Sequence, residues 1–172
     1  DWDPTERPYG TGRALYALIR DGVLDVNKPV LTLFTDDLFR KVDYVWDLIR
    51  VFERAKKRSD VCGAVLAHPT VQLPYGVVYG KSRRFEEKPT LDLNVSTGMY
   101  IISDDVRLYI DEDIFINNTG EVSFEKYMLE PCSRRRGIAV ATVVTGDWLP
   151  LNDWKAIINA EKFLSLCSWA VV

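Results

Sequence analysis

The stretch PVLTLFTDD, residues 29–37, decides the fold class. Its first six residues form a short apolar run of β-forming types, which predicts a buried strand. The run ends abruptly on Asp36 and Asp37. In open α/β sheets, ligands bind beyond the carboxyl ends of the strands. A carboxylate at this point is suited to Mg²⁺, which takes oxygen ligands, or it caps the turn that follows.

Elements of alternating type surround this strand. Apolar residues at helical spacing between Ala14 and Ile19, followed by Gly22, predict a helix with a glycine at its carboxyl end. Asp43 opens a second amphipathic stretch, and residues 61–67 are a second buried-strand candidate. The order helix, strand, helix, strand favours parallel strands in an α/β sheet.

Beyond residue 70 the pattern changes to short β-like runs broken by Pro and Gly. These runs are residues 75–79, 83–87, 98–102 and 138–144, and helices are expected near 104–110, 123–129 and 153–167. The last helix is expected to bury Trp154, Ile157, Ile158 and Leu164. The whole chain, 1–172, is interpreted as a single α/β domain.

Composition excludes several classes of protein. A net charge of −3 gives no general attraction to nucleic acid or to a membrane surface, and no apolar stretch approaches the length of a spanning helix. The three cysteines, without a CxxC pair, argue against a zinc knuckle or a disulfide scaffold. Free thiols favour a reducing, cytoplasmic setting. The basic run 134–136 is interpreted as a solvated loop.

Two further segments are candidates for ligand binding. Gly10, Thr11 and Gly12 precede a helix, where close-approaching backbone amides favour anions, although an ordinary loop-to-helix turn has the same pattern. In residues 86–89, EEKP, Glu87 is able to accept hydrogen bonds from sugar hydroxyls and Lys88 to meet a phosphate. A charged turn without a ligand explains the same residues.

Taken in order, these segments resemble the sugar-phosphate nucleotidyltransferases, also called nucleotide-sugar pyrophosphorylases. The resemblance rests on PYGTGRAL (8–15), LTLFTDDL (31–38), YGVV (75–78), FEEKP (85–89), STGMY (96–100) and GDW (146–148). It implies a Rossmann-like, GT-A-like core with a mixed, mainly parallel sheet flanked by helices. It also implies attack of a sugar 1-phosphate on a nucleoside triphosphate, with release of pyrophosphate.

The resemblance also assigns roles to residues. Asp36 would be catalytic and would bind Mg²⁺, and Lys88 would be catalytic. Nucleotide binding falls to Gly10, Thr11 and Gly12, and sugar-phosphate binding to Gly76, Glu87, Lys88 and Thr97.

Two departures from the family pattern open alternatives. The opening GxGTRL loop is absent, so the chain is expected to match the back two-thirds of the family with its N-terminal strands missing. Pro150 stands where the family has a second metal-binding Asp. A non-catalytic regulatory or binding subunit is the first alternative. A nucleotide-sugar-dependent glycosyltransferase using the D-x-D pattern 111–113 is the second. An exposed sheet edge is expected to pair with a second copy or a partner chain. The base and the sugar stay open.

Overall fold

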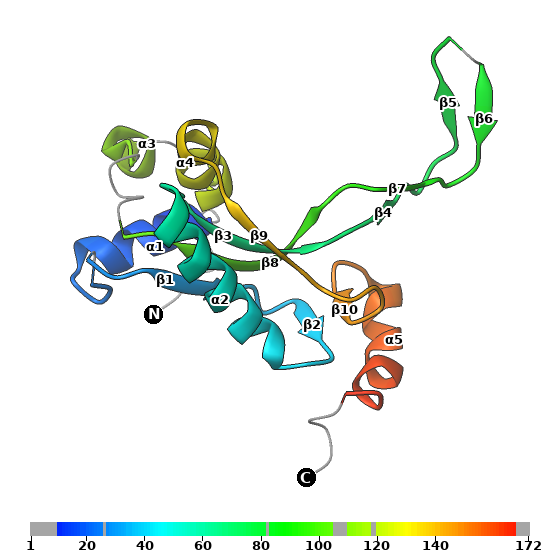
Figure 1. The fold of residues 1–172 in the computed structure, drawn as a ribbon, viewed down its shortest axis with the longest axis horizontal. Helices are drawn as coiled ribbons and strands as arrows, with labels where there is room; N and C mark the ends of the chain where they lie inside the picture. Colours follow the sequence, from blue (N-terminus) through cyan, green and yellow to red (C-terminus); the bar gives the residue numbers. More distant parts are fainter. Residues whose placement is uncertain (1–9, 26, 82, 105–109, 118–119, 168–172) are drawn as a thin grey trace. The chain divides into compact units, whose positions relative to one another are not determined.

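The computed structural model describes residues 10–25, 27–81, 83–104, 110–117 and 120–167. They form the expected α/β fold, with a mixed sheet flanked by helices (Figure 1). Among the described helices, none has the length and apolar character needed to cross a lipid bilayer. The helix expected near 104–110 falls on residues that lie mostly outside the described part.

The main sheet has the strand order β1 (Val30–Leu33), β8 (Val95–Ile102), β3 (Gly63–His68) and β9 (Ala139–Thr142). β3 and the second half of β8 are buried, as expected for central strands. β1 is confirmed as a strand, but the prediction that it is buried was wrong. It stands at one end of the strand order, and Leu31 and Leu33 are 39% and 50% exposed. These two side chains point to the same side of the strand, and both are left partly exposed there.

The chain divides into two compact units and crosses between them within β1, α2 (Asp43–Arg58), β3, β8 and β9. The first unit takes residues 1–32, 50–64 and 100–139. It contains α1 (Thr11–Arg20), α3 (Glu112–Asn117), the π-helix η2 (Glu125–Leu129) and α4 (Glu130–Arg136). Its core is apolar and includes Leu15, Phe52, Cys62, Ile101, Phe115, Val122, Phe124, Met128 and Cys132.

The second unit takes residues 33–49, 65–99 and 140–172. It contains the antiparallel pair β2 (Asp37–Phe39) with β10 (Trp148–Pro150), and α5 (Trp154–Leu164). It also contains a nested hairpin, in which β4 (Val71–Gln72) pairs with β7 (Thr90–Leu91), and β5 (Val77–Tyr79) pairs with β6 (Arg84–Glu86) (Figure 1). Its core includes Tyr44, Leu48, Leu66, Met99, Val143, Phe163 and Cys167.

Local sequence explains where the helices begin and end. α2 opens on Asp43 and closes on Lys56, Lys57 and Arg58, so its charges complement the helix dipole. After α1, Gly22 adopts φ +70°, the left-handed conformation typical of a helix end. The three cysteines are buried, and no disulfide joins them.

Two expectations about helices were wrong. Residues 134–136 belong to α4 rather than to a loop, and Arg134 and Arg136 pair with Glu130 and Asp60. On α5, Trp154, Ile157 and Ile158 are 74%, 45% and 64% exposed. The buried side of α5 instead runs from the half-buried Ala156 and Ala160 to Phe163, because the helix carries two apolar stripes and only one packs.

Candidate functional site

The acidic turn after β1 places two neighbouring carboxylates in different surroundings. Asp36 is exposed, and its backbone carbonyl accepts a hydrogen bond of 2.7 Å from the amide of Leu151. Among the described residues, none makes a hydrogen bond or an ion pair with its carboxylate. Asp36 therefore has a fixed backbone and an available side chain.

Asp37 is partly buried, and its carboxylate is used in contacts within the protein. Its Oδ1 accepts a 2.6 Å hydrogen bond from Nε1 of Trp148. Burial raises the pKa of Asp37 to about 6, the Trp148 hydrogen bond opposes that rise, and the charge of Asp36 adds to it. Gly98, at φ +76°, brings its backbone against the other carboxylate oxygen, and a Cβ there would collide with that oxygen. Asp37 thus ties β2, β10 and β8 together.

Pro150 lies directly across the β2–β10 ladder from Asp37. Asp147 and Asp153, the aspartates close to Pro150 in the sequence, have structural roles. Asp147 is buried, accepts a 2.6 Å hydrogen bond from the Tyr44 hydroxyl and pairs with Lys41 at 3.1 Å. The Tyr44 hydrogen bond, followed by Lys41, holds the pKa of Asp147 below its ordinary value despite burial. Asp153 caps α5 by accepting from the amide of Ala156 at 2.7 Å.

The donor set at this turn suits a hard cation held by few protein ligands. Mg²⁺ usually keeps several waters and binds one or two carboxylates together with substrate phosphates, and Asp36 offers one such carboxylate. Within the described part of the chain, no group of three or more His, Cys, Asp or Glu side chains is placed to hold a metal. The residues present therefore fit a metal that arrives with a phosphorylated substrate better than a preformed cage.

The base of the β5–β6 hairpin brings together three predicted sugar-phosphate residues. A Cβ on Gly76 would meet the Phe85 ring and would lie 2.9 Å from a carboxylate oxygen of Glu87. Glu87 and Lys88 are exposed, and Lys88 adopts φ +47°. A side chain other than glycine or asparagine rarely adopts this left-handed conformation. The turn before Pro89 therefore presents Lys88 with a backbone that costs free energy.

Thr97 is the fourth predicted sugar-phosphate residue, and it lies in the core. It is fully buried, and its hydroxyl donates a 2.9 Å hydrogen bond to the carbonyl of Leu66. Its hydroxyl therefore supports β8 and β3, and its role towards a ligand stays a prediction.

The glycine-rich segment before α1 lies in the first unit. A Cβ on Gly10 would lie 2.5 Å from the carbonyl oxygen of Val122, and the amide of Gly12 donates to the same oxygen at 2.7 Å. The Thr11 hydroxyl accepts from the amide of Phe124 at 3.3 Å and lies 3.4 Å from a carboxylate oxygen of Glu125. Close packing of residues 122–124 accounts for these glycines. Nucleotide binding by this segment stays a prediction.

Sequence reasoning missed the Asp37–Trp148 pair as part of the site. The doubled aspartate after a strand was visible, and so was Trp148 in the GDW segment. Their contact joins residues 111 positions apart, and no local pattern signals such a pairing.

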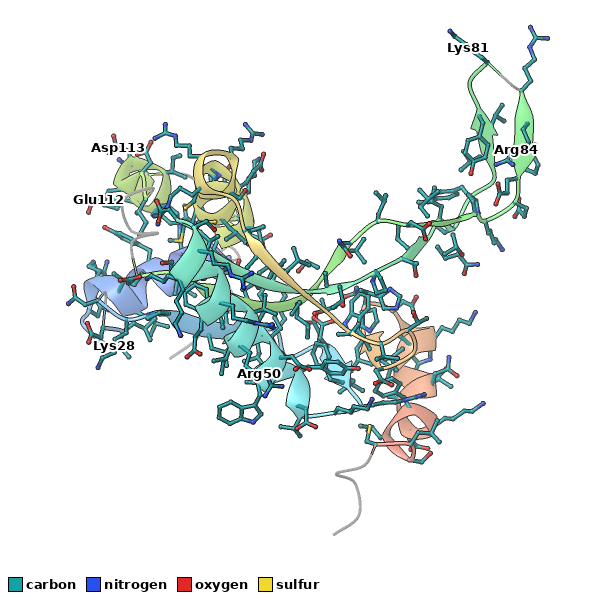
Figure 2. The ribbon with its side chains drawn as sticks, viewed as in Figure 1. Lys28, Arg50, Lys81, Arg84, Glu112 and Asp113 are labelled. Atoms are coloured by element: carbon teal, nitrogen blue, oxygen red, sulfur yellow. The ribbon has the colours of Figure 1, made fainter. Side chains whose placement is uncertain are left out.

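The D-x-D pattern has a local structural role. Asp111, Glu112 and Asp113 are exposed, and Figure 2 shows Glu112 and Asp113 on α3. Oδ1 of Asp111 accepts a hydrogen bond from the amide of Asp113 at 3.2 Å.

Neither the protein-family models nor the curated proteins give a match to this sequence. Solved structures do. A candidate glucose-1-phosphate thymidylyltransferase from Bacillus anthracis, in complex with a sucrose, matches with a TM-score of 0.59 at 19% identity, over 94% of this chain. HddC from Yersinia pseudotuberculosis matches with a TM-score of 0.53 at 17% identity, over 91% of this chain. The chain shares their fold.

A nucleoside-diphosphate-sugar pyrophosphorylase from Vibrio cholerae RC9 matches with a TM-score of 0.50 at 15% identity, over 88% of this chain. This chain spans 62%, 64% and 61% of the lengths of the three similar chains, in the order given. The expected nucleotidyltransferase-like fold is confirmed by these likenesses, which concern the fold.

Proposed function

We propose that this protein binds a sugar 1-phosphate and a nucleoside triphosphate and transfers the nucleotidyl group to the sugar phosphate, releasing pyrophosphate. The available carboxylate of Asp36, at the end of β1 in a nucleotidyltransferase-like fold, is the observation that carries the proposal. In such sheets the ligand site lies beyond the carboxyl ends of the strands.

Asp36 would hold Mg²⁺, which when bound neutralises phosphate charge at the reacting phosphorus. Lys88 would contact the phosphate of the sugar 1-phosphate as a point charge, and Glu87 would accept hydrogen bonds from sugar hydroxyls. Gly76 supports this role because the absence of a side chain lets the Phe85 ring and the Glu87 carboxylate pack against its backbone, which positions Glu87. The nucleophile is already anionic, so no side chain has to remove a proton from it.

Gly10, Thr11 and Gly12 would contact the nucleotide. Because the segment is fixed against residues 122–124, its contribution would be shape and the Thr11 hydroxyl rather than a flexible phosphate loop. The nearby Glu125 carboxylate disfavours a phosphate here and favours an N–H donor such as a base edge.

The experiment is pyrophosphate release from the 172-residue chain with Mg²⁺, each common nucleoside triphosphate and a panel of sugar 1-phosphates. Asp36→Asn should abolish release, and Lys88→Met should raise the KM for the sugar phosphate. Asp92→Asn and Lys81→Met are matched controls, since both side chains are exposed and Lys81 lies at the hairpin tip (Figure 2). Release that is equal in Asp36→Asn and in Asp92→Asn would refute the catalytic assignment.

A binding protein without turnover is the second candidate. It is favoured by Pro150, which stands opposite Asp37 and offers no metal ligand. Asp147 and Asp153 are used in hydrogen bonds within the protein, so Asp36 is the carboxylate left for a metal at the turn after β1. Calorimetry separates the two. Saturable binding of a sugar 1-phosphate that Lys88→Met weakens, with no pyrophosphate formed, would assign the protein to this class.

We also propose that β1 is covered in the assembled protein by a second copy or a partner chain. Support comes from its place at the end of the strand order and from the exposed Leu31 and Leu33. Unpaired edge strands invite pairing with another chain.

A further inference from the structure

A shallow cavity of about 250 Å³, open to solvent, lies in the second unit, beside the β2–β10 pair and α5. It is lined by Arg40, Leu149, Asn159, Lys162, Phe163 and Leu166. The four α5-side residues are spaced i, i+3, i+4 and i+7, so they form one side of the helix and of the turn that follows it. None of these residues belongs to the site proposed above.

The cavity lies on the opposite side of the β2–β10 ladder from Asp37. Side chains alternate between the two faces of a strand. The Trp148 side chain donates a hydrogen bond to Asp37 and therefore lies on the same face of the ladder as Asp37. Leu149, which is paired with Leu38, projects to the opposite face. A ligand in this cavity would thus not contact the carboxylates after β1.

The charge in the cavity is only partly compensated. The described lining residues include two cations, Arg40 and Lys162, and no carboxylate, and Arg40 makes one long ion pair with Asp147, which lies outside the lining. Within the described part of the chain, Lys162 has no ion-pair partner. Nη1 of Arg40 is 3.9 Å from Asp147, beyond hydrogen-bond range, and its buried Nε has no acceptor. Asp147 is already satisfied by Tyr44 and Lys41.

Arg40 is nevertheless held in place. Its guanidinium carbon lies 5.0 Å from the centre of the Phe163 ring, and its backbone amide donates to the Asp147 carbonyl at 3.0 Å. The side chain stays 30% exposed. A guanidinium that lies over a ring and has only one long ion pair is preorganised for an oxyanion, because little rotational freedom remains to be lost on binding.

We propose that this cavity is a second ligand site, which binds a phosphate group between Arg40 and Lys162. Two cations in one lining favour a dianionic phosphate over a monoanionic carboxylate. The apolar side chains Leu149, Phe163 and Leu166 would contact the body of a phosphate monoester, so a ring-bearing monoester should bind more tightly than inorganic phosphate.

The test is an NMR titration of the full chain with inorganic phosphate, phenyl phosphate and acetate, at constant ionic strength and without Mg²⁺ or nucleotide. We expect saturable shifts at residues lining the cavity, with phenyl phosphate tightest and acetate weakest. Lys162→Gln should weaken phenyl phosphate binding about five- to tenfold, as expected for one partly exposed charged contact. Lys155→Gln removes the same charge from α5 outside the cavity and should leave the affinity unchanged.

Arg40 also approaches Asp147, so Arg40→Lys serves as a second variant that keeps the charge and loses the planar fork. It should weaken phosphate binding while the protein stays folded. Asp36→Asn should bind phenyl phosphate normally, which separates this site from the proposed catalytic one. Equal losses in Lys162→Gln and Lys155→Gln, or saturable shifts that map to Asp36 and Lys88 instead, would overturn the proposal.

Discussion

Replacing Asp37 by Asn should make the protein more stable at neutral pH. The carboxyl of Asp37 has an ordinary pKa of 3.8, and burial raises it to about 6 in the folded protein. The folded state therefore holds the proton more tightly than the unfolded chain. The stability of the protein therefore falls as the pH rises from the ordinary pKa of Asp37 to its raised pKa in the folded protein. Above the raised pKa, titration of Asp37 causes no further change in stability.

The size of the effect follows from that pKa difference. At 1.36 kcal/mol per pH unit, a rise from 3.8 to about 6 corresponds to about 3 kcal/mol. Solvent screening at this partly exposed side chain reduces the value to about 1–2 kcal/mol. Asn carries no charge to bury, and its amide oxygen still accepts from Nε1 of Trp148.

Urea unfolding of the wild type and of Asp37→Asn, in EDTA between pH 4 and 7, measures this difference. As the pH rises from 4 to 7, the unfolding free energy of the variant minus that of the wild type should increase by about 1–2 kcal/mol. Asp36→Asn is the control, because it removes only a neighbouring charge that adds to the pKa rise. A difference between Asp37→Asn and wild type that stays constant from pH 4 to 7 would show that Asp37 titrates as an ordinary surface carboxyl.

Three further predictions concern backbone and edge. Gly98→Ala should lower the free energy of unfolding by about 2–4 kcal/mol, because a residue with a Cβ is strained at φ +76° and the Cβ would collide with Asp37. A urea unfolding midpoint equal to that of the wild type would contradict this prediction. Lys88→Gly should raise stability by about 0.5–1 kcal/mol by relieving the left-handed backbone, yet lose sugar 1-phosphate binding, whereas Lys88→Met should lose binding without the gain. If a second copy covers β1, the wild type should be oligomeric in light scattering and Leu31→Lys should shift it towards monomer; a wild type that is monomeric at high concentration would refute cover by a second copy and leave only a partner chain.

The fold was predictable from the sequence where one local signal dominated. Helical spacing located α1 and α2, and an uninterrupted apolar run located β3 as a buried strand. The same reasoning failed for β1, because its composition resembles that of β3 while its place at the end of the strand order leaves Leu31 and Leu33 exposed. Position in a sheet depends on pairing between distant segments, which composition does not encode.

The candidate site was predictable to a similar degree. Gly76, Glu87 and Lys88 were expected together and lie at the base of one hairpin. The hydroxyl of Thr97 is instead used inside the sheet, since a small polar residue has the same appearance in a sequence whether it faces a ligand or a carbonyl. The cavity beside Arg40 had no local signal, because its walls come from β10, α5 and the end of β2.

The π-helix η2 makes the length of its segment matter more than its composition. It follows Phe124, whose ring packs edge-on against Tyr100 at 5.1 Å, and it leads directly into α4, where Cys132 is buried. A π-helix closes i→i+5 hydrogen bonds, so one turn of it holds one more residue than a turn of an α-helix. Deleting one residue of η2 would let a regular α-helix run into α4, whereas inserting one would rotate Phe124 relative to Cys132 by about 100°. In this segment, an insertion should therefore disturb the core more than a deletion.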